Sequence, residues 1–229
     1  MSKVSVLIPC FNESLTIKDV VCDFKTYIPD ADIYVYDNCS TDNTDEIARQ
    51  SGAIVKYSPV KGKGNVVRQM FSEVESDVYI LVDGDSTYSA KDVSKLLELT
   101  DSYDMVIGDR LSSTYFTENK ILFRNFGNRL VRFLVNFMFK SDVRDIMTGY
   151  RAFSKDFVKS FNAKSDNFEI ETEMTIHAIK NGFNIGTVLI DYKDRPDGSK
   201  SKLNTVKDGM RVVIFIFKEF FNNDKKHTE

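Results

Sequence analysis

The sequence lacks most features that would place the chain outside the ordinary globular class. Only 4 of its 229 residues are proline, and no repeat, low-complexity tract or proline-rich linker divides it. No apolar run approaches the ~18–20 residues that a membrane-spanning helix needs. Strand-like residues begin at Lys3, so we expect no targeting peptide. We therefore expect a chain that does not span a membrane by itself.

Charge and cysteine content exclude further classes. The formal net charge of −3 argues against a general nucleic-acid binder. The 3 cysteines, Cys10, Cys22 and Cys39, lack metal-ligand spacing, and we interpret them as reduced thiols of a cytosolic protein. No Gly-x-Gly-x-x-Gly follows the first predicted strand, which disfavours a dinucleotide-dependent oxidoreductase.

Strand and helix signals alternate along the chain. The expected strands are Val4–Ile8, Asp32–Tyr36, Ala53–Tyr57, Val78–Val82, Met105–Ile107, Tyr150–Phe153 and Asn184–Ile190. The expected helices are Ser14–Tyr27, Asp42–Ser51, Gly64–Val74, one opened by a capping box at Ser89–Asp92, Asn119–Phe139, Glu169–Lys180 and Thr205–Phe221. This alternation predicts an α/β fold with a mainly parallel sheet between layers of helices. We interpret residues 1–229 as one domain with a functional boundary near residue 110.

The most informative stretch is Tyr79-Ile-Leu-Val-Asp-Gly-Asp-Ser86, in which apolar strand residues end in two aspartates. Residues i and i+2 of a strand share a face, so Asp83 and Asp85 can aim both carboxylates at one point. Paired oxygens of this kind suit Mg²⁺ or Mn²⁺, which also binds the oxygens of a diphosphate. An ordinary Asp-Gly turn is the simpler alternative.

Three other polar clusters also follow predicted strands or open a helix. They are Pro9–Glu13, Asp37–Ser40 and Lys61–Gly64. The ends of parallel strands share one sheet edge, so the clusters should converge on one crevice, where Lys63 at a helix N-terminus would hold phosphate. Each cluster alone also fits a purely structural role: Asn12 as a helix cap, Asp37 as a turn former and the Gly-Lys-Gly segment as a flexible loop.

The order of these motifs resembles the family 2 glycosyltransferases of GT-A fold, which are Rossmann-like, and within them the polyprenyl-phosphate branch of the dolichol-phosphate mannose synthase group. The resemblance rests on Ile8–Glu13, Tyr36–Asp42, Gly62–Gly64, Asp83–Asp85, Ile107–Arg110, Asp145–Phe153, Phe168–Glu171 and Arg195–Lys202. It covers nearly the whole chain, and its second half is the more specific to the lipid-phosphate branch. It implies a nucleotide-sugar-binding half over residues 1–110 and an acceptor half over 111–229.

The resemblance also implies roles for single residues. Nucleotide binding falls to Pro9, Asn12, Glu13, Asp37, Lys63 and Asp83, the metal site to Asp83 and Asp85, and the acceptor phosphate to Arg110, Arg124 and Asn128. Arg195, Ser201 and Lys202 match a loop that closes over the phosphates. Asp85, Arg124 and Asp145 are the implied catalytic residues, although the role of Asp145 could be conformational. Relatives carry Leu-Gln where this chain has Ser86 and Thr87, so either Thr87 or water would complete the metal site.

These residues suit the transfer of a hexose from a nucleoside diphosphate. A divalent cation and basic side chains stabilise the departing diphosphate, and direct displacement inverts the anomeric carbon. An anionic lipid phosphate as acceptor needs no strong base but needs arginines and lysines to hold it. The rival is a same-fold transferase that elongates a glycan through a sugar hydroxyl, for which Asp145, Glu169 or Glu171 would act as base.

Two predicted helices are unusually apolar. In Asn119–Phe139 the polar residues Arg124, Asn128, Arg132 and Asn136 recur every four positions and the remaining face is almost wholly apolar. The helix Thr205–Phe221 repeats this pattern. Both are typical of amphipathic helices that lie in a membrane interface, with a buried helix pair or a dimer interface as the alternative.

We therefore expect a cytoplasmic enzyme that contacts the inner face of the cell membrane peripherally. Its partners would be a nucleotide-sugar donor and a polyprenyl-phosphate acceptor, with no nucleic acid. An integral-membrane partner or a homo-oligomer stays open.

Overall fold

The computed structural model describes residues 2–111 and 122–224, with backbone only for residues 122–126 and 223–224. Its centre is a seven-stranded sheet in the order β3-β2-β1-β4-β6-β5-β7. The strands are β1 (Val4–Cys10), β2 (Asp32–Asp37), β3 (Ile54–Tyr57), β4 (Val78–Leu81), β5 (Met105–Asp109), β6 (Arg151–Ser154) and β7 (Ile185–Leu189). Only β6 runs antiparallel to its neighbours, β4 and β5, so the predicted mainly parallel sheet is confirmed.

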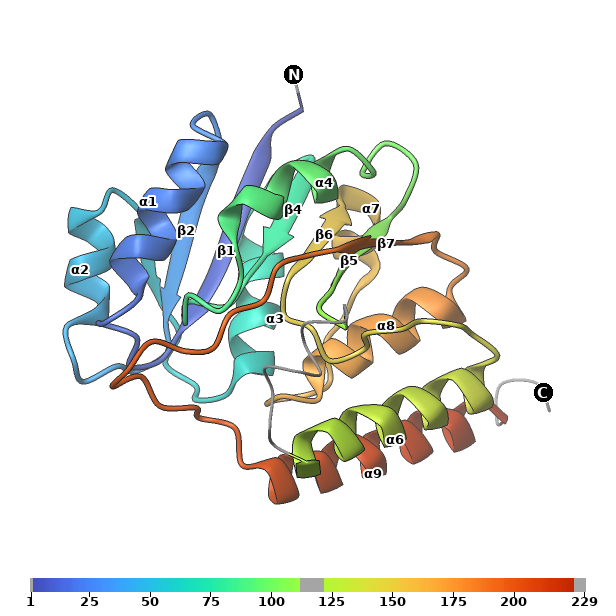
Figure 1. Cartoon of the computed structure of the whole chain (residues 1–229). Coiled ribbons are helices and arrows are strands. Elements are labelled where there is room, and N and C mark those ends of the chain that lie inside the picture. Colours follow the sequence, from blue (N-terminus) through green and yellow to red (C-terminus); the bar gives the residue numbers. More distant parts are fainter. Residues whose placement is uncertain (1, 112–121, 225–229) are drawn as a thin grey trace.

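Helices cover both faces of this sheet (Figure 1). One face carries α1 (Ile17–Tyr27), α2 (Thr44–Gln50), the 3₁₀ turn η1 (Ala90–Asp92) and α4 (Val93–Leu97). The other carries α3 (Lys63–Glu73), α6 (Leu122–Phe139), α7 (Lys155–Ser160), α8 (Ile170–Lys180) and α9 (Thr205–Asp224). Each layer buries its own apolar core, which is why near-continuous apolar runs such as Val6 to Ile8 are fully buried.

Two local predictions differ from the structure. The Ser89 side chain caps no helix, because the chain forms η1 before α4 begins. Asp92 instead accepts a hydrogen bond from the Asp191 amide and pairs with Lys95. Helix α7 was not expected; it begins directly after β6, where the Ser154 hydroxyl accepts a hydrogen bond from Phe157 N–H.

Strands from beyond residue 110 complete the sheet, since β6 inserts between β4 and β5 and β7 pairs with β5. The donor and acceptor halves therefore share one sheet, and their division stays an interpretation of function. Residues 119–121 of the predicted helix Asn119–Phe139 lie outside the described part.

Helices α6 and α9 lie side by side (Figure 1). The Phe139 ring contacts the Phe220 ring near the ends of the two helices. Each buries a narrow stripe, represented by Val135 on α6 and Ile216 on α9. Each also exposes large apolar side chains: Phe133, Phe137, Val206, Met210, Ile214, Phe217 and Phe221. No helix within the described ranges is long and apolar enough to cross a bilayer.

Candidate active site

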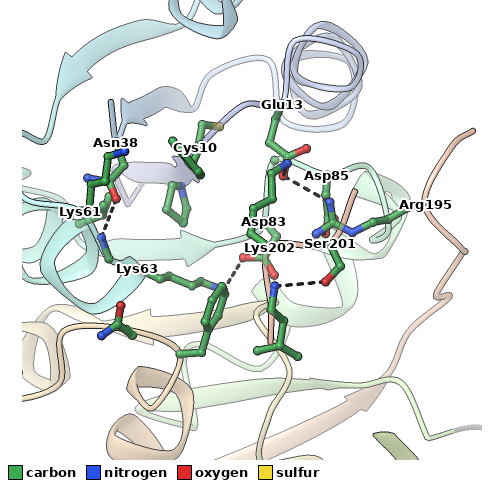
Figure 2. A pocket seen from close by; sticks show the side chains of 18 residues that line it. Cys10, Glu13, Asn38, Lys61, Lys63, Asp83, Asp85, Arg195, Ser201 and Lys202 are labelled. Atoms are coloured by element: carbon green, nitrogen blue, oxygen red, sulfur yellow. Dashed lines mark hydrogen bonds and ion pairs between the residues drawn. The ribbon is translucent and has the colours of Figure 1, made fainter. Parts of the chain in front are cut away.

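The strand-end clusters meet in a cavity of about 270 Å³ (Figure 2). Its lining includes Pro9, Glu13, Lys63, Asp83, Asp85, Arg195, Ser201 and Lys202, all of which the sequence singles out. The parallel strands β1, β2 and β4 end at this edge, and the loop after β7 crosses it, so residues nearly 200 positions apart become neighbours. Convergence on one crevice, as expected from the strand ends, is what the structure shows.

The twin aspartates follow β4 and have different surroundings. Asp83 is partly exposed to the cavity, and its Oδ1 contacts the Lys63 ammonium. Asp85 is 5% exposed; its Oδ1 accepts hydrogen bonds from the Thr87 hydroxyl at 2.6 Å and the Thr87 amide at 3.1 Å. Its Oδ2 contacts the guanidinium of Arg195. The Thr87 hydroxyl thus donates its hydrogen bond to Asp85 and orients that carboxylate.

Lys63, the first residue of α3, bridges two carboxylates. Its Nζ contacts Asp83 and lies 2.5 Å from Oε1 of Glu171, a buried residue of α8. Burial lowers the pKa of Lys63, but the two carboxylates outweigh it and hold this pKa well above its ordinary value. The lysine is therefore a fixed positive charge between the donor cavity and α8.

The N-terminus of α3 is partly covered by neighbouring groups of the protein. The Asp166 carbonyl accepts a hydrogen bond from Asn65 N–H at 3.3 Å, and the Gly62 amide donates to Asn38 Oδ1 at 2.8 Å. Gly62 has φ +125°, and a Cβ there would lie 2.2 Å from that same Asp166 carbonyl. The glycines of this motif let the segment before α8 close over the helix end. The amides of Gly62 and Asn65 are therefore already engaged by other groups of the protein.

The loop after β7 is tied to the donor side by charge. Nη1 of Arg195 lies 3.3 Å and Nζ of Lys202 lies 2.7 Å from the same oxygen, Oε1 of Glu13. Lys202 also donates to the Asn12 carbonyl at 2.7 Å. Burial lowers the pKa of Arg195, but Asp85 and Glu13 outweigh it and raise the pKa above its usual value.

Asn12 and Asp37, the other residues predicted to bind the nucleotide, make contacts that hold loops of the protein together. Asn12 has a left-handed φ of 54°, and its Oδ1 accepts from the Thr41 amide, so it joins two loops and caps no helix. Asp37 ends β2; its Oδ2 accepts from Ser40 N–H, while its buried Oδ1 has no hydrogen-bond partner in the described part of the chain. A buried acceptor without a partner is costly unless a ligand satisfies it.

A second, smaller cavity of about 120 Å³ adjoins the first and shares Lys63, Asp83, Asp85 and Arg195 with it. Arg110 from the end of β5 and Asn128 from α6 line it, as do Tyr192, Met147 and Glu171. The Arg110 guanidinium lies 5.3 Å over the Tyr192 ring. Arg124 precedes Asn128 by four residues in α6, and its side chain lies outside the described part.

Asp145, expected at the reaction centre, holds Arg110. Its Oδ2 accepts from Nε at 2.8 Å and its Oδ1 from Nη2 at 3.0 Å. Asp145 is 3% exposed and lines neither cavity, so the structure brings its partner, and not Asp145 itself, to the cavity surface.

The carboxylates of Asp83 and Asp85 fit a divalent cation. Asp83 and Asp85 line both cavities, and no third His, Cys, Asp or Glu completes a cluster with them among residues 2–111 and 122–224. Mg²⁺ and Mn²⁺ are commonly held by one or two carboxylates together with water and substrate phosphate. Two carboxylates beside a cavity with room for a diphosphate meet that requirement, and their oxygens are hard donors of the right kind.

Several site residues are visible only in the structure. A Cβ on Gly149 would lie 2.5 Å from Oδ2 of Asp83, so this glycine makes room for the carboxylate. The buried Tyr88 hydroxyl accepts a hydrogen bond from the Gly149 amide. Arg151, fully buried, donates to the carbonyls of Ile146 and Thr148, and burial lowers its pKa to about 10. The Thr-Gly-Tyr-Arg motif was the available signal, although it does not reveal these contacts.

The family model described as Glycosyl transferase family 2 matches residues 5–161, which is more than half of the chain. The chain belongs to glycosyl transferase family 2. The predicted family and its GT-A fold are thereby confirmed, and the resulting activity class is glycosyl transfer.

Relatives of this family 2 member match over most of its length. Glycosyltransferase AglJ of Haloferax volcanii is 36% identical over 96% of this chain and 73% of its own. A dolichyl-phosphate hexose transferase of the same organism is 29% identical over 94% of this chain and 92% of its own. Glucosyl-3-phosphoglycerate synthase of Mycobacterium tuberculosis, crystallised with Mn²⁺, UDP and phosphoglyceric acid, superposes with a TM-score of 0.79. It covers 96% of this chain and 78% of its own at 20% identity, so it shows the fold alone.

Proposed function

We propose that this family 2 glycosyltransferase is an inverting enzyme that moves a hexose from a nucleoside-diphosphate sugar to a polyprenyl phosphate, undecaprenyl or dolichyl. The observation that carries the proposal is the pair of adjoining cavities that share Lys63, Asp83, Asp85 and Arg195. The larger suits a nucleoside diphosphate, and the smaller offers Arg110 to a second anion. The shared residues would lie where the sugar passes from one phosphate to the other.

The occupied carboxylates favour a phosphate acceptor over a sugar hydroxyl. A hydroxyl acceptor needs a base within reach of its proton. Asp145 is bound to Arg110, and Glu171 is bound to Lys63. The third candidate, Glu169, lines neither cavity. A phosphate oxyanion attacks without losing a proton, so it fits a site whose acids are paired with cations.

On the donor side, Pro9, Phe11 and Asn38 would line the nucleoside pocket. Asp37 lines neither cavity and would support this pocket from the end of β2. Mg²⁺ or Mn²⁺ held by Asp83 and Asp85 would neutralise the departing diphosphate. Arg195 and Lys202, already over this cavity, would bind the same phosphates.

On the acceptor side, Arg110 and Asn128 would hold the lipid phosphate, with Arg124 in the same helix as Asn128. An oxygen of that phosphate attacks the anomeric carbon as the bond to the diphosphate breaks, so the configuration inverts. Asp145 fixes the orientation of Arg110 and so positions this oxyanion. The names of relatives that act on dolichyl phosphate support this choice of acceptor.

The exposed apolar face of α6 and α9 supports peripheral attachment at the inner face of the membrane. It gathers Phe133, Phe137, Met210, Ile214 and Phe221, each at least 58% exposed. Exposed basic residues on the same helices, Arg129, Lys207 and Lys218, are suited to anionic headgroups. Because α6 also carries Asn128 to the smaller cavity, a lipid phosphate at the membrane surface would lie near the site.

The test offers radiolabelled nucleotide sugars with three acceptors: undecaprenyl phosphate, undecaprenol and a soluble oligosaccharide. We expect label in the organic phase only with the phosphate. Asp85→Asn should abolish that transfer, and Asp166→Asn, which changes an exposed carboxylate outside both cavities, should leave it intact. Labelling of undecaprenol or of the oligosaccharide instead would overturn the proposed acceptor and favour a hydroxyl nucleophile.

A further inference from the structure

The edge of the donor cavity that carries the aspartates already holds cations supplied by the protein. Arg195 contacts Oδ2 of Asp85 and, 3.3 Å away, Oε1 of Glu13. Lys202 reinforces this arrangement through Glu13 at 2.7 Å. The segment from Arg195 to Lys202 is therefore fastened by charge to the residues that would otherwise face the donor (Figure 2).

This arrangement leaves Asp85 poorly disposed toward a metal ion alone. Its Oδ1 accepts two hydrogen bonds from Thr87, and its Oδ2 is paired with Arg195. Asp83 is in turn paired with Lys63. A free divalent cation would have to displace a partly buried guanidinium, and it would gain few protein ligands in return, because the described residues contain no cluster of three metal-binding side chains.

A nucleoside diphosphate changes this balance. Its oxygens complete the coordination of the cation, and the same phosphates are strong partners for a guanidinium. Arg195 can then exchange the Asp85 carboxylate for a phosphate without losing its counter-ion. Lys202 can make the same exchange from Glu13, since both cations line the larger cavity.

We propose that Arg195 competes with the divalent cation for Asp85, so that the cation binds tightly only together with a nucleoside diphosphate. This inference rests on the proposed function, which requires both ligands. It gives Arg195 a role before the donor arrives, as the counter-ion of Asp85. It also couples the affinities for the metal and the nucleotide in both directions, as thermodynamic linkage requires.

The first experiment measures Mn²⁺ binding without nucleotide, from the electron paramagnetic resonance signal of the free ion. Removal of the competing charge in Arg195→Met should tighten Mn²⁺ binding about tenfold, a typical size for coupled sites. Lys200→Met is the matched control, because it removes an exposed charge from the same loop. It should bind Mn²⁺ as the unchanged protein does, and Arg195→Lys, which keeps the charge, should stay within about threefold of it. Equal affinities in the unchanged protein and Arg195→Met would overturn the proposal, as would Arg195→Lys behaving like Arg195→Met.

The second experiment measures the affinity for UDP and for GDP with and without saturating Mn²⁺. The increase that Mn²⁺ causes should be smaller in Arg195→Met than in the unchanged protein, by about tenfold. If neither nucleotide brings Mn²⁺ to either protein, the metal site of the proposed function is wrong and this inference falls with it. If Mn²⁺ binds with nucleotide, but its affinity without nucleotide is the same in the unchanged protein and Arg195→Met, only the proposed competition is wrong.

Discussion

Asp145 and Arg110 form a two-pronged ion pair, with Nε to Oδ2 at 2.8 Å and Nη2 to Oδ1 at 3.0 Å. The Arg110 amide adds a third hydrogen bond to Oδ2 at 3.2 Å. Both side chains are at least nine-tenths buried, so the pair joins the end of β5 to the loop before β6 away from bulk water. A carboxylate engaged in this way orients a cation, because both of its oxygens accept hydrogen bonds from Arg110.

Breaking this pair should destabilise the fold. Asp145→Asn removes the carboxylate that binds the buried Arg110 guanidinium through two prongs, and we expect a loss of about 3 kcal/mol in the free energy of unfolding. Urea denaturation followed by circular dichroism measures it. Asp32→Asn, which removes one partner of the exposed Lys3–Asp32 pair, should cost far less, because water screens this pair. Equal effects of the two substitutions would contradict the buried pairing.

Local sequence patterns anticipate the donor side of the site well. Strand β4 is mostly buried, and Asp83 and Asp85 follow its last residue, Leu81, so the sequence pattern alone places both carboxylates at a sheet edge. Parallel neighbours β1 and β2 then bring Glu13 and Asp37 to the same edge. These inferences need only short-range patterns and the rule that ligands collect beyond the ends of parallel strands.

Contacts between distant segments could not be anticipated. Nothing near Lys63 in the sequence indicates that it faces Glu171, because that contact depends on how α8 packs against α3. The contact of Asp83 with Gly149 depends likewise on β6 inserting antiparallel beside β4. The predicted capping box at Ser89 also depended on distant contacts. Its local pattern fits a helix start, but Asp92 accepts a hydrogen bond from the Asp191 amide, and the Ser89 side chain caps no helix.

Acid should weaken the attachment of α9 to the rest of the fold. Glu219 of α9 pairs with Lys180 at 3.0 Å and Lys164 at 2.7 Å. Burial raises the pKa of Glu219, but these lysines outweigh it and lower the pKa below the ordinary value of a glutamate. Its contribution is therefore present above that value and is lost as the pH falls through the lowered pKa. Glu219→Gln should cost about 1–2 kcal/mol near neutral pH and less in acid, below the ordinary pKa range of a carboxyl group.

Urea denaturation of the unchanged protein and of Glu219→Gln at both pH values measures this difference. Glu98→Gln, at an exposed carboxylate, should show no difference at either pH. A cost for Glu219→Gln that is the same at both pH values would show that its ionisation is not what holds α9.

The apolar face of α6 should decide vesicle binding. Phe133 and Phe137 stack at 5.8 Å and are 62% and 74% exposed, so replacing both by Ser should spare the core. We expect affinity for phosphatidylglycerol vesicles to fall by at least on the order of a hundredfold, given about 1.5–3 kcal/mol for each of the two aromatic side chains. Co-sedimentation measures it.

Tyr27→Ser is the control, since Tyr27 is 50% exposed at the end of α1, on the other face of the sheet. Vesicle binding that survives the double substitution would contradict the membrane role of this face. In that case light scattering with and without the substitutions would report whether the same face joins two copies of the chain.

Gly149→Ala should disable the metal site without unfolding the protein. The added methyl group would lie 2.5 Å from Oδ2 of Asp83, closer than real Cβ contacts allow, and the carboxylate must therefore turn away. We expect Mn²⁺ binding in the presence of UDP to weaken by at least about tenfold, because one of two protein ligands is displaced. Gly209→Ala is the matched control: a Cβ there meets nothing within 4 Å, and alanine favours the helix by about 0.5–1 kcal/mol. If Gly149→Ala binds Mn²⁺ as Gly209→Ala does, the cation is not held at Asp83, because no ligand could be displaced this far without a change in affinity.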